Sequence, residues 1–267
     1  DIAVNNAKTS NNHICIYEES KNIEERYKEN IELATQIKEA ILENRIICHY
    51  QPLLNIENSE IYSYESLVRL IDNKGNSLAP YKFLDFSKKI KLYSSITKIV
   101  VAQACKTFQN RDENFSINLS VDDIKDLETV DFILKTIKET NTSSRVTFEI
   151  LESEGIENYQ EVISFINQIK SLGARIAIDD FGTGYSNFEH LLRLDVDYIK
   201  IDGSLIKNIV TDDKHRLIVE TIVSFAKRIG IKTVAEFVSD EKILQTIKEI
   251  GISCAQGYHI GKPETLV

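Results

Sequence analysis

The sequence predicts an α/β fold, specifically a TIM-type (β/α)8 barrel with an irregular first strand. From Arg45 onward, eight short β-rich runs alternate with amphipathic helical stretches. Repetition of β followed by α over residues 45–267 is typical of a parallel sheet, and eight units favour closure into a barrel. An open doubly wound sheet is the alternative, but no G-x-G-x-x-G motif follows the first run.

The strand candidates follow one another at regular intervals along the chain. They are RIICHYQ (45–51), IYSYESLVRL (61–70), FSINLSV (115–121), VTFEILES (146–153), ARIAIDD (174–180), VDYIKIDG (196–203), KTVAEFV (232–238) and CAQGYHIG (254–261). Most precede a helical pattern, such as EVISFINQIKSL (161–172). The first run ends in Gln51-Pro52 with no helix before the second, so we expect the barrel to be irregular there.

The residues before the barrel follow a different pattern. Residues 1–20 form a polar leader, and residues 21–44 carry apolar side chains at helical spacing among many charges. We expect residues 21–44 to form one amphipathic helix, either a connector to the barrel at 45–267 or the first helix that covers the barrel. The sequence contains no Met, so we expect it to be a fragment of a longer protein.

Composition excludes several classes of function. The net charge of −9 argues against a surface that binds DNA or RNA polymers. No apolar run is long enough to span a bilayer and no signal peptide opens the sequence, so we expect no membrane contact from this segment. Four cysteines without a C-x-x-C pair favour a reducing, cytoplasmic location, although a parent protein could be membrane-anchored elsewhere.

Polar side chains gather at the carboxyl ends of the predicted strands, where TIM barrels place their chemistry. They are Glu65, Asn118, Glu149, Asp179, Asp180, Lys200, Glu236 and Gln256. Any one of these residues alone is better explained as a helix cap or a solvated loop residue. Strands are depleted in such residues, however, so helix caps and loop positions do not explain the whole ring. Five carboxylates against one lysine leave about four uncompensated negative charges on one rim. Two divalent ions would balance them, which indicates metal-assisted hydrolysis of a phosphoester.

Alternation along the strands refines this ring. Lys200 and Asp202 are expected to share a strand face, whereas Glu152 is expected just beyond its strand, holding a loop. Asp179 and Asp180 are adjacent, so one of them must leave strand geometry, which the following glycines permit.

Several motifs occur together in one order. They are Gln51-Pro52, ESLVR at 65–69, Asn118 in SINLS, EILE at 149–152, DDFGTGYSN at 179–187, KID at 200–202, AEFV at 235–238 and QGY at 256–258. Over roughly residues 30–265 this order resembles the EAL family of cyclic di-GMP phosphodiesterases. Residues 1–20 also resemble the end of a GGDEF (diguanylate cyclase) domain, which implies a parent protein with GGDEF followed by EAL.

The resemblance implies roles for individual residues. The metal ligands would be Glu65, Asn118, Glu149, Asp179, Asp180 and Glu236, around two Mg2+ or Mn2+ ions. The catalytic residues would be Lys200, which positions the attacking water, Glu236 as general base, and Glu65. Cyclic di-GMP would contact Gln51, Leu67, Arg69 and Gln256, and its product would be linear pGpG. Glu152 would anchor the DDFGTGYSN loop, which in the family takes part in the metal site and a homodimer contact.

Three departures from the family pattern accompany these motifs. The signature Ala is Ser66, the usual EGVE reads Glu236-Phe237-Val238-Ser239, and the usual FIPxAE-like segment reads FLDFSK at 83–88. A non-catalytic cyclic di-GMP receptor and a protein-interaction module are the alternative functions. Surplus apolar residues in NFEHLLRL (187–194) fit either a homodimer surface or packing inside the helical layer, and the resemblance to the EAL family implies the homodimer.

Overall fold

The computed structural model describes residues 20–154, 160–182 and 188–266. The chain divides into two compact units, one made of residues 1–45 and 70–93 and the other of residues 46–69 and 94–267. The predicted helix before the barrel belongs to the first unit, and the predicted ring of polar residues belongs to the second.

The second unit is built on a closed barrel of eight strands, as predicted. The strands are β1 (Ile46–Asn55), β2 (Glu60–Ile71), β4 (Asn114–Leu119), β5 (Val146–Leu151), β6 (Arg175–Phe181), β7 (Tyr198–Ile201), β8 (Lys232–Ala235) and β9 (Cys254–Gln256). Neighbours from β2 through β9 pair in parallel, and β1 closes the ring by pairing with both β9 and β2.

The expected irregularity lies in β1, which runs antiparallel to β9 with Leu53 opposite Gln256. Only residues 56–59 separate β1 from β2, too few for the crossover helix that a parallel neighbour requires. The short link at 56–59 therefore makes β1 antiparallel to its neighbours. The expected end of the first strand at Gln51-Pro52 was wrong, because β1 continues through these residues to Asn55 by pairing with β9.

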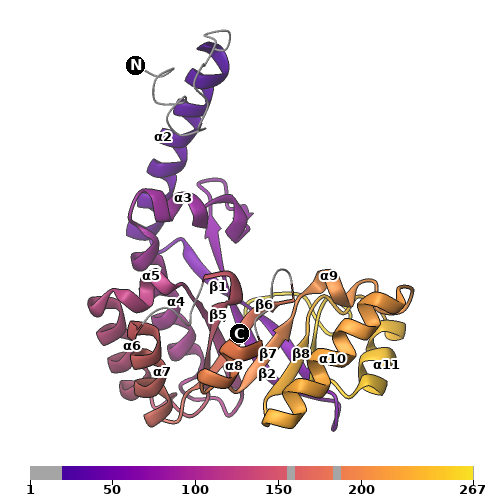
Figure 1. Ribbon diagram of the computed structural model, residues 1–267. Helices are drawn as coiled ribbons and strands as arrows, with labels where there is room; N and C mark the ends of the chain where they lie inside the picture. Colours follow the sequence, from indigo (N-terminus) through magenta and orange to yellow (C-terminus); the bar gives the residue numbers. More distant parts are fainter. Residues whose placement is uncertain (1–19, 155–159, 183–187, 267) are drawn as a thin grey trace. The chain divides into compact units, whose positions relative to one another are not determined.

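Helices cover the outside of the barrel (Figure 1). They are α4 (Tyr93–Phe108), α5 (Val121–Lys125), α6 (Leu127–Glu139), α7 (Gln160–Ser171), α8 (Phe188–Arg193), α9 (Gly203–Ile206), α10 (Asp213–Ile229) and α11 (Glu241–Ile250), with a short 3-10 turn at Glu152–Glu154. Strand side chains that point outward pack on them; for example, the rings of Phe115 on β4 and Phe108 on α4 stack with their centroids 4.6 Å apart. Such apolar and aromatic contacts pack the helices against the outside of the barrel.

Side chains that point into the barrel change character along the strands. A buried cluster of Ala177, Tyr198, Val234 and Cys254 fills the inside toward the amino ends of the strands. Two residues further along, the same inward face carries Asp179 on β6 and Lys200 on β7. Alternation in the strands therefore delivers polar side chains to one layer at the carboxyl end of the barrel.

The four apolar residues of the homodimer prediction are three in helix α8 and Leu194, directly after it. Leu191 and Leu194 are buried, and the ring of Phe188 contacts that of Phe225 at 4.6 Å between centroids. Leu192 alone among the four is exposed, to 62%. Three of the four residues thus pack within the helical layer, and the homodimer remains a prediction.

The first unit contains α2 (Ser20–Leu42), β3 (Ser77–Leu78), a 3-10 turn at Pro80–Lys82 and α3 (Leu84–Lys89). β3 pairs antiparallel with the end of β2, with Leu70 opposite Leu78. α2 is the predicted amphipathic helix, with Ile37 and Ala40 buried on one side. None of the described helices combines the length and the apolar character that crossing a bilayer requires. The GGDEF-like residues 1–19 lie outside the described part, and the division at residue 45 stays a prediction.

Candidate metal centre and substrate pocket

Lys200 stands at the centre of a carboxylate cluster inside the barrel. Its Nζ lies 2.7 Å from Glu149, 2.9 Å from Glu236, 3.1 Å from Asp179 and 3.6 Å from Glu65. The lysine side chain is 2% exposed. These five side chains come from five strands or strand ends and converge because each occupies an inward position at the carboxyl end of its strand.

Glu65 is held by amides as well as by charge. Asn118 donates to its Oε1 at 2.7 Å, and Gln256 donates to its Oε2 at 2.6 Å. The same Gln256 nitrogen lies 3.3 Å from Oε1 of Gln51, and Gln51 donates to the carbonyl of Gly261 at 3.0 Å. This chain of hydrogen bonds fixes the Glu65 carboxylate across the seam where β1, β2 and β9 meet.

The adjacent aspartates separate as the sequence predicted. Asp180 has a φ of 55°, in the left-handed region, so its side chain leaves the alternation of β6. Gly182 follows with a φ of 103°, and its N–H donates to Oε2 of Glu152 at 3.2 Å. Glu152 lies just past the end of β5, as expected for a residue that holds the loop after β6. The rest of that loop, residues 183–187 with Gly184, lies outside the described residues.

The carboxylates of this cluster differ in their affinity for protons. Burial raises the pKa of Glu236 to about 8, although Lys200 acts against this, and it raises the pKa of Glu149 well above the usual range. Burial also raises the pKa of Asp180, with neighbouring carboxylates adding to it. Burial alone would raise the pKa of Glu65, but Lys200 and the two amide hydrogen bonds lower it. Conversely, burial favours the neutral amine of Lys200, yet the four carboxylates raise its pKa well above its usual value. Without another cation, the cluster therefore holds protons near neutral pH.

Two groups of carboxylates have the geometry of divalent metal sites. Oxygens of Glu65, Glu149 and Asp179 lie within 4.8 Å of one another, and so do oxygens of Asp179, Asp180 and Glu236. Asp179 belongs to both groups, so it would be a ligand common to the two candidate sites. The donors are all oxygens, the ligands that Mg2+ and Mn2+ prefer.

A buried side-chain oxygen of Gln256, without a hydrogen-bond partner in the described part of the chain, is also consistent with a hydrated cation at this site. Oε1 of Gln256 makes no hydrogen bond to the described residues, although its residue is only 4% exposed. Water on a cation beside Glu65 would donate to such an oxygen. Asn118 presents its amide at the same edge and is exposed, so its oxygen is open to an ion. The residues present therefore fit two oxygen-liganded divalent ions.

A pocket of about 440 Å³ opens above this cluster. It is lined by all four residues expected to contact substrate, which are Gln51, Leu67, Arg69 and Gln256, and by Glu65, Asp180 and Glu236. It also contains five residues to which the sequence analysis gave no role in the site, namely Lys207, Phe237, Ser239, Tyr258 and Pro263. Phe237 and Ser239 are the two departures in the EFVS segment, so the sequence held a signal for them. Nothing in the sequence pattern placed Lys207 here.

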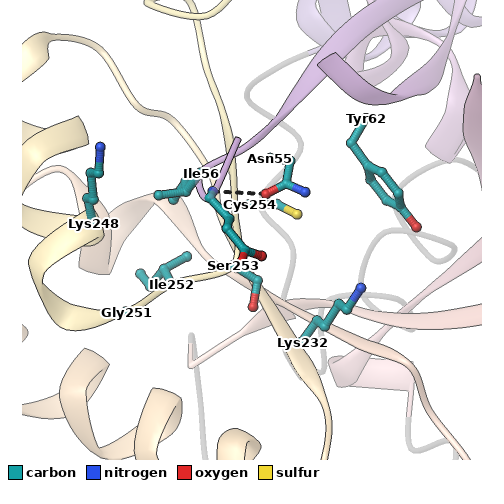
Figure 2. Close-up of a pocket in the computed structure, with 10 residues that line it drawn as sticks. Asn55, Ile56, Tyr62, Lys232, Lys248, Gly251, Ile252, Ser253 and Cys254 are labelled. Carbon is teal, nitrogen blue, oxygen red and sulfur yellow. Dashed lines mark hydrogen bonds between the residues drawn. The ribbon is translucent and has the colours of Figure 1, made fainter. Parts of the chain in front are cut away.

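A second cavity, of about 410 Å³, lies at the opposite end of the barrel (Figure 2). Tyr62, Lys232 and Cys254 line it from the amino ends of β2, β8 and β9, and Asn55 lines it from the end of the reversed β1. It contains none of the strand-end carboxylates, so the first pocket is the candidate active site.

Comparisons with known proteins agree with this geometry. A family model described as "EAL domain" matches residues 34–263. The cyclic di-GMP phosphodiesterase PdeB of Shewanella oneidensis is 36% identical over 275 residues, covering 100% of this chain and 32% of that protein. The bifunctional diguanylate cyclase/cyclic di-GMP phosphodiesterase MucR of Pseudomonas aeruginosa is 28% identical over 271 residues, covering 98% of this chain and 39% of that protein.

Solved structures share the fold of the chain. The PaMucR phosphodiesterase in complex with c-di-GMP has a TM-score of 0.82 and 27% identity, covering 87% of this chain and 97% of that chain. The chain spans about a third of the length of the curated relatives PdeB and MucR.

Proposed function

The chain belongs to the EAL domain family, and on that premise we propose that it hydrolyses cyclic di-GMP to linear pGpG with two divalent cations, Mg2+ or Mn2+. The observation that carries the proposal is the pair of carboxylate groups that share Asp179, beside a pocket that presents Arg69. Two such ions on one phosphodiester suit in-line displacement at phosphorus. Relatives named as cyclic di-GMP phosphodiesterases, and a structural neighbour that contains c-di-GMP, support the choice of substrate.

Six residues would hold the ions. One ion would be held by Glu65, Asn118, Glu149 and Asp179, and the other by Asp179, Asp180 and Glu236. When bound, the ions would lower the pKa of water and stabilise the negative charge that develops on phosphorus.

The remaining groups of the site would act on the substrate and on the water. Arg69 suits a phosphate because its guanidinium can donate to two oxygens at once. Gln51, Gln256 and Leu67 would contact the dinucleotide from the same pocket. Lys200 would hold the attacking water through its ammonium group, which the neighbouring carboxylates keep in place. Glu236 lies 2.9 Å from that ammonium and would receive the proton from the water.

A non-catalytic receptor of cyclic di-GMP is the second candidate. It would need the same pocket but not the two carboxylate groups. The chain keeps every residue of the ligand set that its resemblance implies, which favours the enzyme.

The test is a direct assay of the purified chain. We expect cyclic di-GMP to be converted to pGpG in Mg2+ or Mn2+, as followed by chromatography, and to stay intact in excess chelator. Asp179→Asn is the sharpest variant, because it alters the residue common to both carboxylate groups, and Lys135→Met on the exposed face of α6 is a control. Binding without conversion in either metal would favour the receptor, and full turnover in chelator would refute the metal-dependent reaction.

Three wider features belong to the same proposal. We infer that the chain is a cytoplasmic segment of a parent protein with GGDEF followed by EAL, and the bifunctional name of MucR supports that pairing of domains. We infer that it forms a homodimer through the surface near α8, where Leu192 is exposed. Its partners are cyclic di-GMP and a second copy of itself, with no nucleic-acid polymer.

A further inference from the structure

Phe237 adopts a backbone conformation that bulky residues avoid. Its φ is 55°, in the left-handed region, where a residue other than glycine is strained. Its side chain is also 55% exposed, so the strain is not repaid by burial in the core. The resembling family usually has glycine at this position, which suits that φ. A strained, exposed aromatic residue at the rim of a pocket indicates a role in binding.

The ring of Phe237 is held from below by a residue that cannot carry a side chain. A Cβ added to Gly203 would overlap Cδ2 and Cγ of Phe237, so the ring rests directly on the backbone at the start of α9. This contact fixes the ring in spite of its exposure. The glycine at 203 and the phenylalanine at 237 are therefore complementary.

Lys207 accompanies the ring from the end of the same short helix. Its Nζ lies 4.2 Å from the centroid of Phe237, within the range of a cation–π contact. The lysine is exposed, and it lines the pocket together with Phe237 and Arg69. Because its stem is flexible, the ammonium can turn from the ring to another acceptor when a ligand enters.

The position of this pair relative to the carboxylates limits what it can contact. Phe237 directly follows Glu236, the carboxylate proposed to receive the proton, and Asp180 lines the same pocket. A phosphodiester held at the carboxylates by Arg69 would carry its nucleosides outward along the pocket. An apolar ring and a cation beside that path match a purine base, which offers a flat π surface and acceptor atoms on its edge.

We propose that Phe237 and Lys207 form a base-recognition site for one guanine of the substrate, in which the ring packs against the base and the ammonium donates to O6 and N7. This inference rests on the proposed function for its substrate class. Guanine offers two adjacent acceptors to a lysine, whereas adenine replaces O6 with a donor. The pair would therefore bind the base and also select guanine over adenine.

Equilibrium binding of two cyclic dinucleotides tests both roles. Dissociation constants for cyclic di-GMP and cyclic di-AMP are measured by titration calorimetry in chelator, and kcat and KM for cyclic di-GMP are measured separately in Mg2+. Phe237→Leu keeps an apolar side chain but removes the flat ring, and we expect it to weaken cyclic di-GMP binding by about tenfold or more. Lys207→Met keeps the stem, and we expect it to reduce the preference for guanine over adenine by about five- to tenfold.

Two further variants separate this role from general damage. Gly203→Ala changes neither Phe237 nor Lys207 but adds a methyl group that displaces the ring. It should therefore weaken cyclic di-GMP binding as much as Phe237→Leu does. Tyr81 and Lys82 form a similar exposed pair outside the pocket, with Nζ 6.0 Å from the ring centroid. Tyr81→Leu and Lys82→Met should leave both dissociation constants unchanged, and thermal unfolding confirms that each variant is folded.

The outcomes distinguish this inference from the proposed function. Binding of cyclic di-GMP without any turnover would overturn the proposed function and leave the base site standing. Turnover with unchanged dissociation constants in Phe237→Leu and Lys207→Met would overturn the base site alone. Equal losses for both dinucleotides in Lys207→Met would also overturn it, because the lysine would then serve the phosphates and not the base.

Discussion

Replacing Lys200 by methionine tests the charge balance of the site most directly. Its ammonium lies within 3.6 Å of four carboxylates, and its side chain is 2% exposed. Methionine fills much of the same space but leaves those carboxylates without the cation at their centre. Removing one partner of a buried ion pair destabilises a protein by about 3–5 kcal/mol. For a chain of this length, we expect the melting temperature of the metal-free variant to fall by roughly 6–20 °C.

The expected loss depends on protons and on metal. Burial already favours the protonated forms of Glu149 and Glu236, so lowering the pH lets the variant neutralise its carboxylates. The difference in melting temperature between the two proteins should therefore shrink from pH 8 to pH 5. Added Mg2+ or Mn2+ should shrink it as well, because the ions replace the missing positive charge. Thermal unfolding followed by circular dichroism, in chelator and in metal, measures both effects.

A matched control separates this effect from the loss of a lysine in general. Lys135 pairs with Glu139 on the surface at 3.7 Å, and both side chains are mostly exposed, so Lys135→Met should change the free energy of unfolding by at most about 0.5 kcal/mol. In turnover, Lys200→Met should lower kcat by orders of magnitude with only a mild loss of affinity. Equal melting temperatures of Lys200→Met and the unaltered protein in chelator at pH 8 would refute the charge argument. Near-normal kcat with a large rise in the dissociation constant would make Lys200 a substrate contact.

Three other predictions concern the carboxylates and the assembly. Glu65→Ala should remove most turnover and leave the far-ultraviolet circular dichroism unchanged, because it deletes a proposed metal ligand; an unchanged rate would place the metal centre elsewhere. The pKa of Glu236 is about 8 in the folded protein and about 4.5 when unfolded, so the metal-free folded state holds more protons between these values. Its free energy of unfolding should fall as pH rises from 4.5 to 8, by up to about 1.4 kcal/mol per pH unit, and Glu236→Gln should flatten that slope in chemical denaturation; identical slopes would contradict the assignment. Light scattering across a concentration series should show a dimer that Leu192→Asp weakens, with specific activity falling in parallel, and a strictly monomeric protein of constant activity would rule the dimer out.

The fold was predictable because its signals are local. Most strands are short, largely apolar runs with a polar residue at or near the carboxyl end, and the missing helix after Gln51-Pro52 showed where regular repetition stops. The direction of β1 followed only from the structure, since pairing with β9 joins residues 53 and 256, which are far apart in the sequence. Asp202 shows the limit of the alternation rule. β7 ends at Ile201, and Asp202 caps α9 by accepting from the N–H of Ser204, so the start of the helix holds its carboxylate and strand alternation alone does not set its direction.

The residues of the pocket wall were harder to predict than those of the carboxylate cluster. Strand residues such as Glu149 have their direction set by alternation, so their convergence follows from the fold class. Phe237 and Lys207 lie after strand ends, where no periodicity fixes direction. Their contact depends on the left-handed backbone at Phe237 and on the absence of a side chain at Gly203, and neither can be deduced from an isolated residue type.

The structure shows where the five carboxylates and the one lysine counted in the sequence lie relative to one another. Five carboxylates and one lysine suggested an excess of about four negative charges, but the lysine contacts four of the five carboxylates and lies between both candidate metal groups. In the metal-free state, protons on Glu149 and Glu236 reduce the remaining excess, as the direction of their pKa shifts requires. Divalent ions would compete with those protons for the same oxygens, so metal binding must release protons and must strengthen as pH rises. The features that favour two cations therefore also make the affinity for them depend on pH, even though every ligand is an oxygen atom.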